Sequence, residues 1–225
     1  MSETFRRYEK KYLLDGRQYE ELLEKMKGRI RADKFFASDI NSIYYDTDKL
    51  QLIRRSVEKP EYKEKLRIRS YREAGPDDEV YVEFKKKLDG IVYKRRTKGR
   101  CAELLEDIGR CHFADEQIGK EISYALSYYP PLRPAIYIGC KRNSYVAEDD
   151  RRLRLTFDKD IRYRLKKLSL NSSEYDKPVT DRIVMELKVP EALPLWLTAI
   201  LDELAIYPQG FSKVGTAFMK EIRGI

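Results

Sequence analysis

The sequence has little of what marks an exported, disulfide-stapled or membrane-spanning chain. Its three cysteines (Cys101, Cys111 and Cys140) are odd in number and lack Cys-x-x-Cys spacing, which excludes a disulfide framework or a zinc site as the simplest interpretation. The single histidine, His112, is typical of a surface or capping residue rather than a metal ligand or general base. No apolar run reaches the roughly 18 residues of a transmembrane helix, and the N-terminus lacks the apolar segment of a signal peptide. These absences predict a cytoplasmic protein with no transmembrane segment of its own, held at the inner face of a membrane only if a membrane-protein partner anchors it.

Length and charge narrow the class of protein. At 225 residues and 42% hydrophobic content, the chain can bury one sizeable core. We found no internal repeat, low-complexity tract or linker, so we predict a single domain over residues 1–225 with a helical segment at about 98–129. The 46 Lys and Arg outnumber the 38 Asp and Glu and give a net charge of +8, which favours an anionic partner. Nucleic acid, an acidic membrane surface and phosphates all remain open at this point.

The hydrophobic pattern predicts an antiparallel sheet with helices around it. Period-two alternation and turn signals indicate about eight long strands, at 4–14, 41–46, 62–71, 80–87, 91–96, 135–146, 151–158 and 181–189, with a further short strand at 161–165. Helices are expected at 16–31, 48–56, twice within 98–129, at 193–205 and at 212–223. Asp15 is a candidate N-cap, and Asp89-Gly90 is typical of a two-residue hairpin. Because no βαβ alternation occurs, the predicted fold class is α+β: an antiparallel eight-stranded β-barrel tunnel with helices packed outside.

Charged residues occupy one face of most of these strands and apolar residues the other. The charged positions are Arg7, Glu9, Lys11, Lys65, Arg67, Arg69, Glu83, Lys85, Lys94, Arg96, Arg142, Arg152, Arg154, Glu186 and Lys188. Such a face is ordinarily a solvated sheet surface. Its recurrence over six strands, its excess of cations and the presence of helices with apolar stripes favour a barrel whose charged faces line the lumen.

A lumen of this composition needs an anion. Guanidinium groups bind phosphate oxygens as a fork and lysines add compact charges, so the mixture suits a chain of phosphates. The carboxylates Glu9, Glu83 and Glu186 could hold a divalent cation that bridges phosphate oxygens, with Glu186 the first choice.

The motifs RYEKKYLL, SIYYDT, KLRIRSY, VYVEFKKK, LRLTFD, MELKV and FSK occur in an order that resembles the polyphosphate polymerase (VTC) domain of the vacuolar transporter chaperone family. That family falls within the CYTH-like triphosphate tunnel metalloenzymes. The resemblance runs nearly end to end and implies an eight-stranded tunnel. It also implies an ATP-polyphosphate phosphotransferase, which adds the γ-phosphoryl of ATP to polyphosphate with Mn²⁺ or Mg²⁺ at a tunnel carboxylate.

Matching the motifs residue by residue implies roles for individual side chains. The resemblance assigns catalytic positions to Lys11, Arg67, Arg69, Lys85, Arg142, Arg154 and Lys213. It assigns further substrate-binding positions, together with the strand pattern, to Arg7, Lys65, Lys94, Arg96 and Lys188, and the metal to Glu186, with Glu9 and Glu83 as further candidates. Phosphoryl transfer of this kind asks for positioning and charge neutralisation rather than covalent catalysis.

One departure from the superfamily pattern bears on the choice of reaction. The hydrolytic branch carries an ExExK signature on its first strand, where this chain has Arg7-Tyr8-Glu9-Lys10-Lys11. An arginine in the first glutamate position removes a metal ligand and adds a phosphate-binding cation, which favours a polymerase over a metal-dependent inorganic or nucleoside triphosphatase. A non-catalytic module that binds polyanions or nucleic acid is the third interpretation and ranks last, since Trp196 falls at a helix-packing position.

Overall fold

The computed structural model describes residues 8–58, 60–88, 91–111, 113, 116–129, 131–189 and 192–223. Arg7, His112 and the expected hairpin turn Asp89-Gly90 lie outside the described residues. The strands are β1 (Tyr8–Leu14), β2 (Ile30–Asp46), β3 (Tyr62–Ser70), β4 (Glu79–Leu88), β5 (Ile91–Arg100), β6 (Arg133–Ala147), β7 (Arg154–Arg164), β8 (Lys177–Pro178) and β9 (Ile183–Val189). The helices are α1 (Gly16–Lys25), α2 (Gln51–Glu58), α3 (Cys101–Asp107), the 3₁₀ turn η1 (Ile108–Arg110), α4 (Glu116–Tyr128), α5 (Leu195–Glu203) and α6 (Lys213–Arg223).

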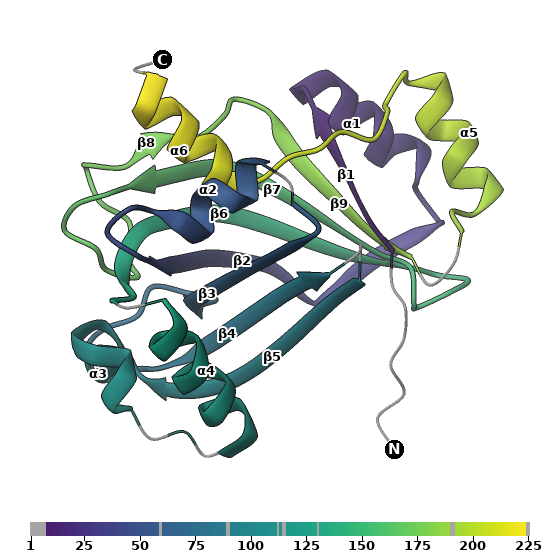
Figure 1. Ribbon diagram of the computed structural model, residues 1–225. Coiled ribbons are helices and arrows are strands. Elements are labelled where there is room, and N and C mark those ends of the chain that lie inside the picture. Colours follow the sequence, from purple (N-terminus) through teal and green to yellow (C-terminus); the bar gives the residue numbers. More distant parts are fainter. Residues whose placement is uncertain are drawn as a thin grey trace. The chain divides into compact units, whose positions relative to one another are not determined.

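Within the described residues the strands form one nine-stranded antiparallel sheet, in the order β1-β9-β7-β6-β2-β3-β4-β5, with β8 beside β7 (Figure 1). This confirms the α+β class and the antiparallel sheet. The hydrogen-bonded path has two ends, β1 and β5, in the part of the chain that is described, so closure into a barrel stays a prediction.

Three element boundaries differ from the sequence-based expectation. Most of the two segments expected as separate strands, 151–158 and 161–165, lies in the single strand β7, which continues through Asp160 although that residue has a left-handed backbone conformation (φ 47°). Strand β2 begins at Ile30 rather than near residue 41, and α1 correspondingly ends at Lys25. The short strand β8 arises within a segment expected to be a loop.

The chain divides into two compact units, and the prediction of one domain over 1–225 stays a prediction. The first unit comprises the described residues of Met1–Ser38, Cys140–Ile161 and Thr180–Phe211. The second comprises those of Asp39–Gly139, Arg162–Val179 and Ser212–Ile225. No helix in the described ranges has the length and apolar character needed to cross a membrane.

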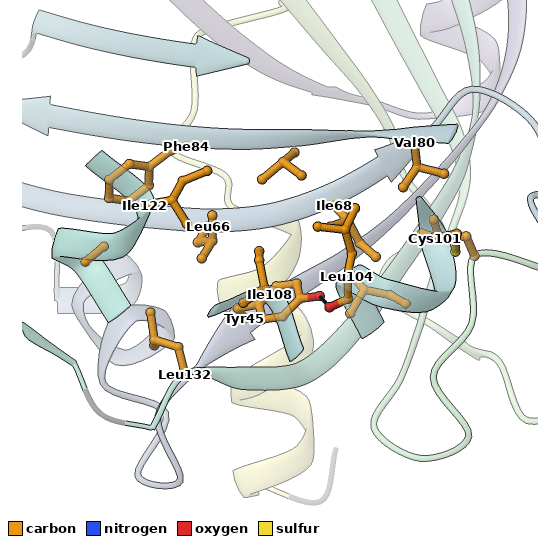
Figure 2. Close-up of a cluster of buried hydrophobic side chains, with 14 of the residues drawn as sticks. Tyr45, Leu66, Ile68, Val80, Phe84, Cys101, Leu104, Ile108, Ile122 and Leu132 are labelled. Atoms are coloured by element: carbon orange, nitrogen blue, oxygen red, sulfur yellow. Dashed lines mark hydrogen bonds between the residues drawn. The ribbon is translucent and has the colours of Figure 1, made fainter. Parts of the chain in front are cut away.

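The second unit packs the apolar faces of β2, β3 and β4 against α3, η1 and α4. Figure 2 shows Leu66, Ile68 and Phe84 from the strands close to Leu104 and Ile122 from the helices, all of them almost fully buried. The expected alternation therefore holds, because one face of these strands forms a core with helices and the other is left to the charged residues.

The first unit repeats this arrangement with different elements. Asp15 caps α1 in a capping box, accepting a hydrogen bond from the Gln18 backbone N–H at 2.8 Å, which confirms its predicted role. The expected apolar stripe of α1 lies in the core, where Tyr19 and Leu22 pack with Met185 and Leu187 of β9 and with residues of α5. In this unit too, the charged faces of β1, β7 and β9 are the faces that the core does not use.

Candidate polyanion-binding site

The strand register of the second unit arranges its charged residues in rows. Directly opposite residues of antiparallel strands point to the same face of the sheet. One row reads Lys65, Lys85, Lys94 across β3, β4 and β5, the next reads Arg67, Glu83, Arg96, and the third begins with Arg69 opposite Tyr81. We call this surface, defined by Lys65, Arg67, Arg69, Glu83, Lys85, Lys94 and Arg96, the cationic face.

The lysine row is electrostatically unfavourable by itself. Lys65 lies directly opposite Lys85, and Lys85 lies directly opposite Lys94. Like charges in directly opposite positions destabilise a sheet. A face that keeps three such lysines together is therefore suited to an anion that lies over them.

Glu83 is the buried counter-charge of the cationic face. Its side chain is only 1% exposed and accepts hydrogen bonds from Arg67 Nη2 at 2.6 Å and from Lys94 Nζ at 2.6 Å. Arg69 and Arg96 lie within 3.8 and 3.9 Å of the same carboxylate. Burial alone would raise the pKa of Glu83, but the positive charges of Arg67, Arg69 and Lys94 outweigh it and hold that pKa well below its usual range. Glu83 is thus ionised at neutral pH and balances part of the surrounding charge.

Arg67 is fixed from two sides. Its Nε and Nη2 donate to Glu83, and its Nη1 donates to the Tyr44 hydroxyl at 2.7 Å. Burial favours the neutral phenol, yet the charges of Arg67, Lys65 and Arg69 lower the pKa of Tyr44 to about 7. Burial also lowers the pKa of Lys94 to about 8, although Glu83 opposes this. The charge of this face therefore changes in the physiological pH range.

The first unit carries a second charged cluster on β1 and β9. Register places Lys11 opposite Glu186, and Glu9 opposite Lys188. Lys11 Nζ lies 3.6 Å from Glu9 and 4.0 Å from Glu186, and Lys188 Nζ lies 3.1 Å from Glu186. Lys11 also donates to the Phe211 carbonyl at 3.2 Å, which ties β1 to the segment before α6. Two carboxylates and two ammonium groups thus alternate on one face.

Two arginines of the first unit have acidic partners. Arg142 forms a bidentate pair with Asp158 at 2.6 and 2.7 Å, and the Asp158 side chain is fully buried. Burial opposes the charge of Arg142, but the Asp158 carboxylate dominates and raises the pKa of that arginine. Arg154 is exposed, lies opposite Lys188 and pairs with Asp33. Arg142 is accordingly a mostly buried cation held by two hydrogen bonds, and Arg154 is an exposed cation held by a surface pair.

The structure brings the predicted residues together in two groups. The second unit holds the cationic face and also Lys213, the first residue of α6. The first unit holds Glu9, Lys11, Arg142, Arg154, Glu186 and Lys188. Arg7 lies outside the described residues. Among the described residues no group of three or more His, Cys, Asp or Glu is positioned to hold a metal ion, so the metal site stays a prediction.

Sequence reasoning missed three residues. Tyr44 was overlooked because it is adjacent to a second tyrosine, Tyr45. Alternation along the strand NSIYYD does distinguish the two, since Tyr45 lies on the core face and Tyr44 on the charged face. Asp158 was expected only as the last residue of the strand at 151–158, yet it lies buried within β7. Thr156, opposite Glu186, carried no sequence signal at all.

Together, the fold and the site define a class: an α+β protein built on a large antiparallel sheet, with clustered cations on the faces that its two cores leave uncovered. The family model of the VTC domain matches residues 6–220. The chain belongs to the VTC domain family.

Comparison with solved structures extends the fold assignment. A protein from Bacillus halodurans, provisionally described as an adenylate cyclase, superimposes with a TM-score of 0.57 at 16% sequence identity, covering 91% of this chain and 92% of that one. A Vibrio parahaemolyticus protein of the same provisional description gives a TM-score of 0.45 at 12% identity, covering 98% of each chain. A search of curated proteins finds no match. The first structure shows that the fold extends over nearly the whole chain.

Proposed function

We propose that this VTC domain is a polyphosphate polymerase that transfers the γ-phosphoryl group of ATP to a growing polyphosphate chain. The observation that carries the proposal is the row Lys65, Lys85, Lys94, beside a second row in which Arg67 and Arg96 flank one buried carboxylate. Like charges kept in register favour a ligand with one negative charge per repeat, as in a phosphate chain. Membership of the VTC domain family supports the same ligand.

The proposal gives each group of residues a part in the reaction. The cationic face binds the phosphate chain and neutralises its charge, with the lysine row in direct contact. Arg67, fixed by Glu83 and Tyr44, keeps its neighbours in place. Phosphoryl transfer of this kind depends on holding the attacking and leaving oxygens in line and on stabilising charge at the transferred group. In the proposed form the sheet closes into a tunnel of the triphosphate tunnel metalloenzyme type, which excludes water from the chain.

Of the three predicted metal ligands, Glu186 and Glu9 suit a divalent cation better than Glu83 does. Glu186 and Glu9 lie on one face, with Lys11 directly opposite Glu186 and two residues after Glu9 on the same strand. Their carboxylate oxygens are ligands suited to Mn²⁺ or Mg²⁺ shared with phosphate oxygens. All three carboxylates have cationic neighbours, but Glu83 is 1% exposed and accepts from Arg67 and Lys94 at 2.6 Å, whereas Glu9 and Glu186 are 24% and 12% exposed. The proposal therefore assigns the ion to Glu186 and Glu9. Bound there, the ion would supply charge neutralisation at the phosphoryl oxygens.

Product analysis tests the reaction. The purified protein is incubated with ATP and Mn²⁺, and the products are separated on gels stained for polyphosphate while free phosphate is measured in parallel. We expect long stained chains with little free phosphate. Release of phosphate from ATP or tripolyphosphate without long product would overturn the polymerase proposal in favour of the triphosphatase.

A matched pair of lysines tests the site. Lys94 lies on the cationic face, whereas Lys86 lies on the opposite face of β4, where it pairs with Glu121 of α4. Removing a cation about 4 Å from a phosphate charge at an effective dielectric of about 20 costs up to about 4 kcal/mol, so Lys94→Gln should weaken tripolyphosphate binding at least about tenfold. Lys86→Gln should bind like the wild type. Equal affinities in the two variants would move the ligand away from the cationic face.

The triphosphatase remains the second candidate because part of the hydrolytic signature is present. Glu9 and Lys11 occupy two of its three positions, and their side chains lie 3.6 Å apart. Restoring the third position with Arg7→Glu should raise phosphate release relative to polymer formation. If the product ratio does not change, the first-strand arginine does not decide between the two reactions.

A further inference from the structure

Thr156 carries a buried hydroxyl that has no hydrogen-bond partner in the part of the chain that the structure describes. It lies within β7 and is 6% exposed, and its Oγ1 has no partner among the described residues. A buried hydroxyl that makes no hydrogen bond is costly, and such groups in native structures call for an explanation. A state of the protein in which this hydroxyl is bonded would remove the cost.

The strand register shows which acceptor lies nearest in the sheet. Thr156 is directly opposite Glu186 of β9, so the two side chains share a face with their Cβ atoms roughly 4.5–5.5 Å apart. Glu186 is itself opposite Lys11 of β1, which makes the row Lys11, Glu186, Thr156. In this structure two lysines lie close to the Glu186 carboxylate, Lys188 at 3.1 Å and Lys11 at 4.0 Å.

The same two lysines are the cations that a phosphate chain would attract on this face. Both are partly exposed, whereas the Glu186 side chain is 12% exposed and Thr156 is buried beside it. A polyanion can therefore recruit the lysines, while Glu186 stays in the sheet. A carboxylate has about four lone-pair sites, so Glu186 can then accept a further hydrogen bond beside its other partners. Thr156 is the adjacent hydroxyl that has no acceptor among the described residues.

We propose that Thr156 is a positioning residue for Glu186 in the ligand-bound protein, donating its hydroxyl hydrogen to the carboxylate once phosphate has drawn Lys11 and Lys188 away. This inference rests on the proposed function in one respect, namely that a phosphate chain binds this face. The ligand-free structure bears the cost of the unbonded hydroxyl, and ligand binding relieves it. Thr156 thereby favours the bound state without touching the phosphate.

The test compares Thr156→Val with Thr156→Ser. Valine replaces the hydroxyl by a methyl group of similar size, so the ligand-free variant should unfold at the same temperature as the wild type or higher. Its affinity for inorganic tripolyphosphate, measured by titration calorimetry, should fall about tenfold, the equivalent of 1.4 kcal/mol. Serine should restore the affinity. A ligand-free valine variant that is less stable but binds normally would show a purely structural threonine and overturn the inference.

A double-variant cycle isolates the pair. In a Glu186→Gln background, Thr156→Val should change the affinity less than about twofold, because the charged acceptor is gone. A tenfold loss in both backgrounds would contradict the pairing with Glu186. Thr97→Val, at a buried threonine of the second unit, serves as the matched control and should leave affinity unchanged.

Polymer formation is assayed in parallel, so that the two proposals can fail separately. Tripolyphosphate binding that depends on Thr156, without any polymer, would refute the polymerase and retain the inference. If the wild type forms polymer and the Thr156→Val variant binds tripolyphosphate normally, the inference about Thr156 is refuted and the polymerase proposal is retained. A wild type that does not bind tripolyphosphate would overturn both.

Discussion

Replacing Glu83 with glutamine should destabilise the second unit and make it dependent on added anion. The carboxylate is 1% exposed and is surrounded by Arg67, Arg69, Lys94 and Arg96, all within 3.9 Å of its oxygens. Glutamine keeps the shape but leaves these cations without their buried counter-charge. Removing one member of a buried ion pair costs about 3–5 kcal/mol.

That cost can be measured by thermal unfolding. For a domain of 150–250 residues, each kcal/mol corresponds to about 2–4 °C, so Glu83→Gln should lower the unfolding temperature by about 6–20 °C at neutral pH. Glu121→Gln is the matched control, because Glu121 also pairs with two cations, Lys86 and Arg95, but is 24% exposed on the other face. Glu121→Gln should lower the free energy of unfolding by at most about 1 kcal/mol.

The sign of the pH dependence gives a second measurement. The pKa of Glu83 is held below its usual range, so its ionised carboxylate stabilises the folded state. This contribution to the free energy of unfolding is fully present above the ordinary carboxyl pKa and is lost only as the pH falls through the lowered pKa. The difference in stability between wild type and Glu83→Gln should therefore persist at pH 5. Tripolyphosphate should stabilise the variant more than the wild type, since it replaces the missing negative charge. A variant as stable as the wild type would refute this account of the cationic face.

Three further predictions concern charge and capping. Tripolyphosphate affinity should fall as the pH rises from 6.5 to 9, because Tyr44 becomes anionic near pH 7 and Lys94 loses its proton near pH 8. Tyr44→Phe should flatten the lower part of this pH profile. A Tyr44→Phe profile identical to that of the wild type would contradict the role of the phenol. Asp158→Asn should cost about 3–5 kcal/mol in chemical denaturation, because it leaves Arg142 buried without its carboxylate, and a loss below 1 kcal/mol would contradict this. Asp15→Ala should cost about 1 kcal/mol through the lost α1 cap and leave tripolyphosphate affinity unchanged, whereas weaker binding would implicate this cap in the site.

The sequence predicted what local rules control. The alternation of Leu66 and Ile68 with Lys65 and Arg67 correctly separated the core face of β3 from its charged face, because a strand has only two faces and one was apolar. The capping signal at Asp15 worked for a similar reason, since a cap is decided within four residues.

The sequence could not predict which side chains the strand register brings together from distant parts of the chain. Nothing in the local pattern places Glu83 among cations from two other strands, or Thr156 opposite Glu186. The strand β7 shows the same limit, because a left-handed Asp160 inside a strand resembles a turn in sequence. Register and backbone exceptions depend on tertiary packing, which a single sequence does not reveal.

The row Lys65, Lys85, Lys94 also sets a direction and a length scale. Each lysine belongs to a different strand, so the row runs across the strands with a repeat of roughly 4.8 Å, the spacing of a β-sheet. A flexible anionic polymer can match that repeat only by lying perpendicular to β3, β4 and β5. The backbone hydrogen bonds of the sheet therefore fix the spacing of the three lysines, and under the proposed function a bound polymer would cross one strand for each lysine that it contacts.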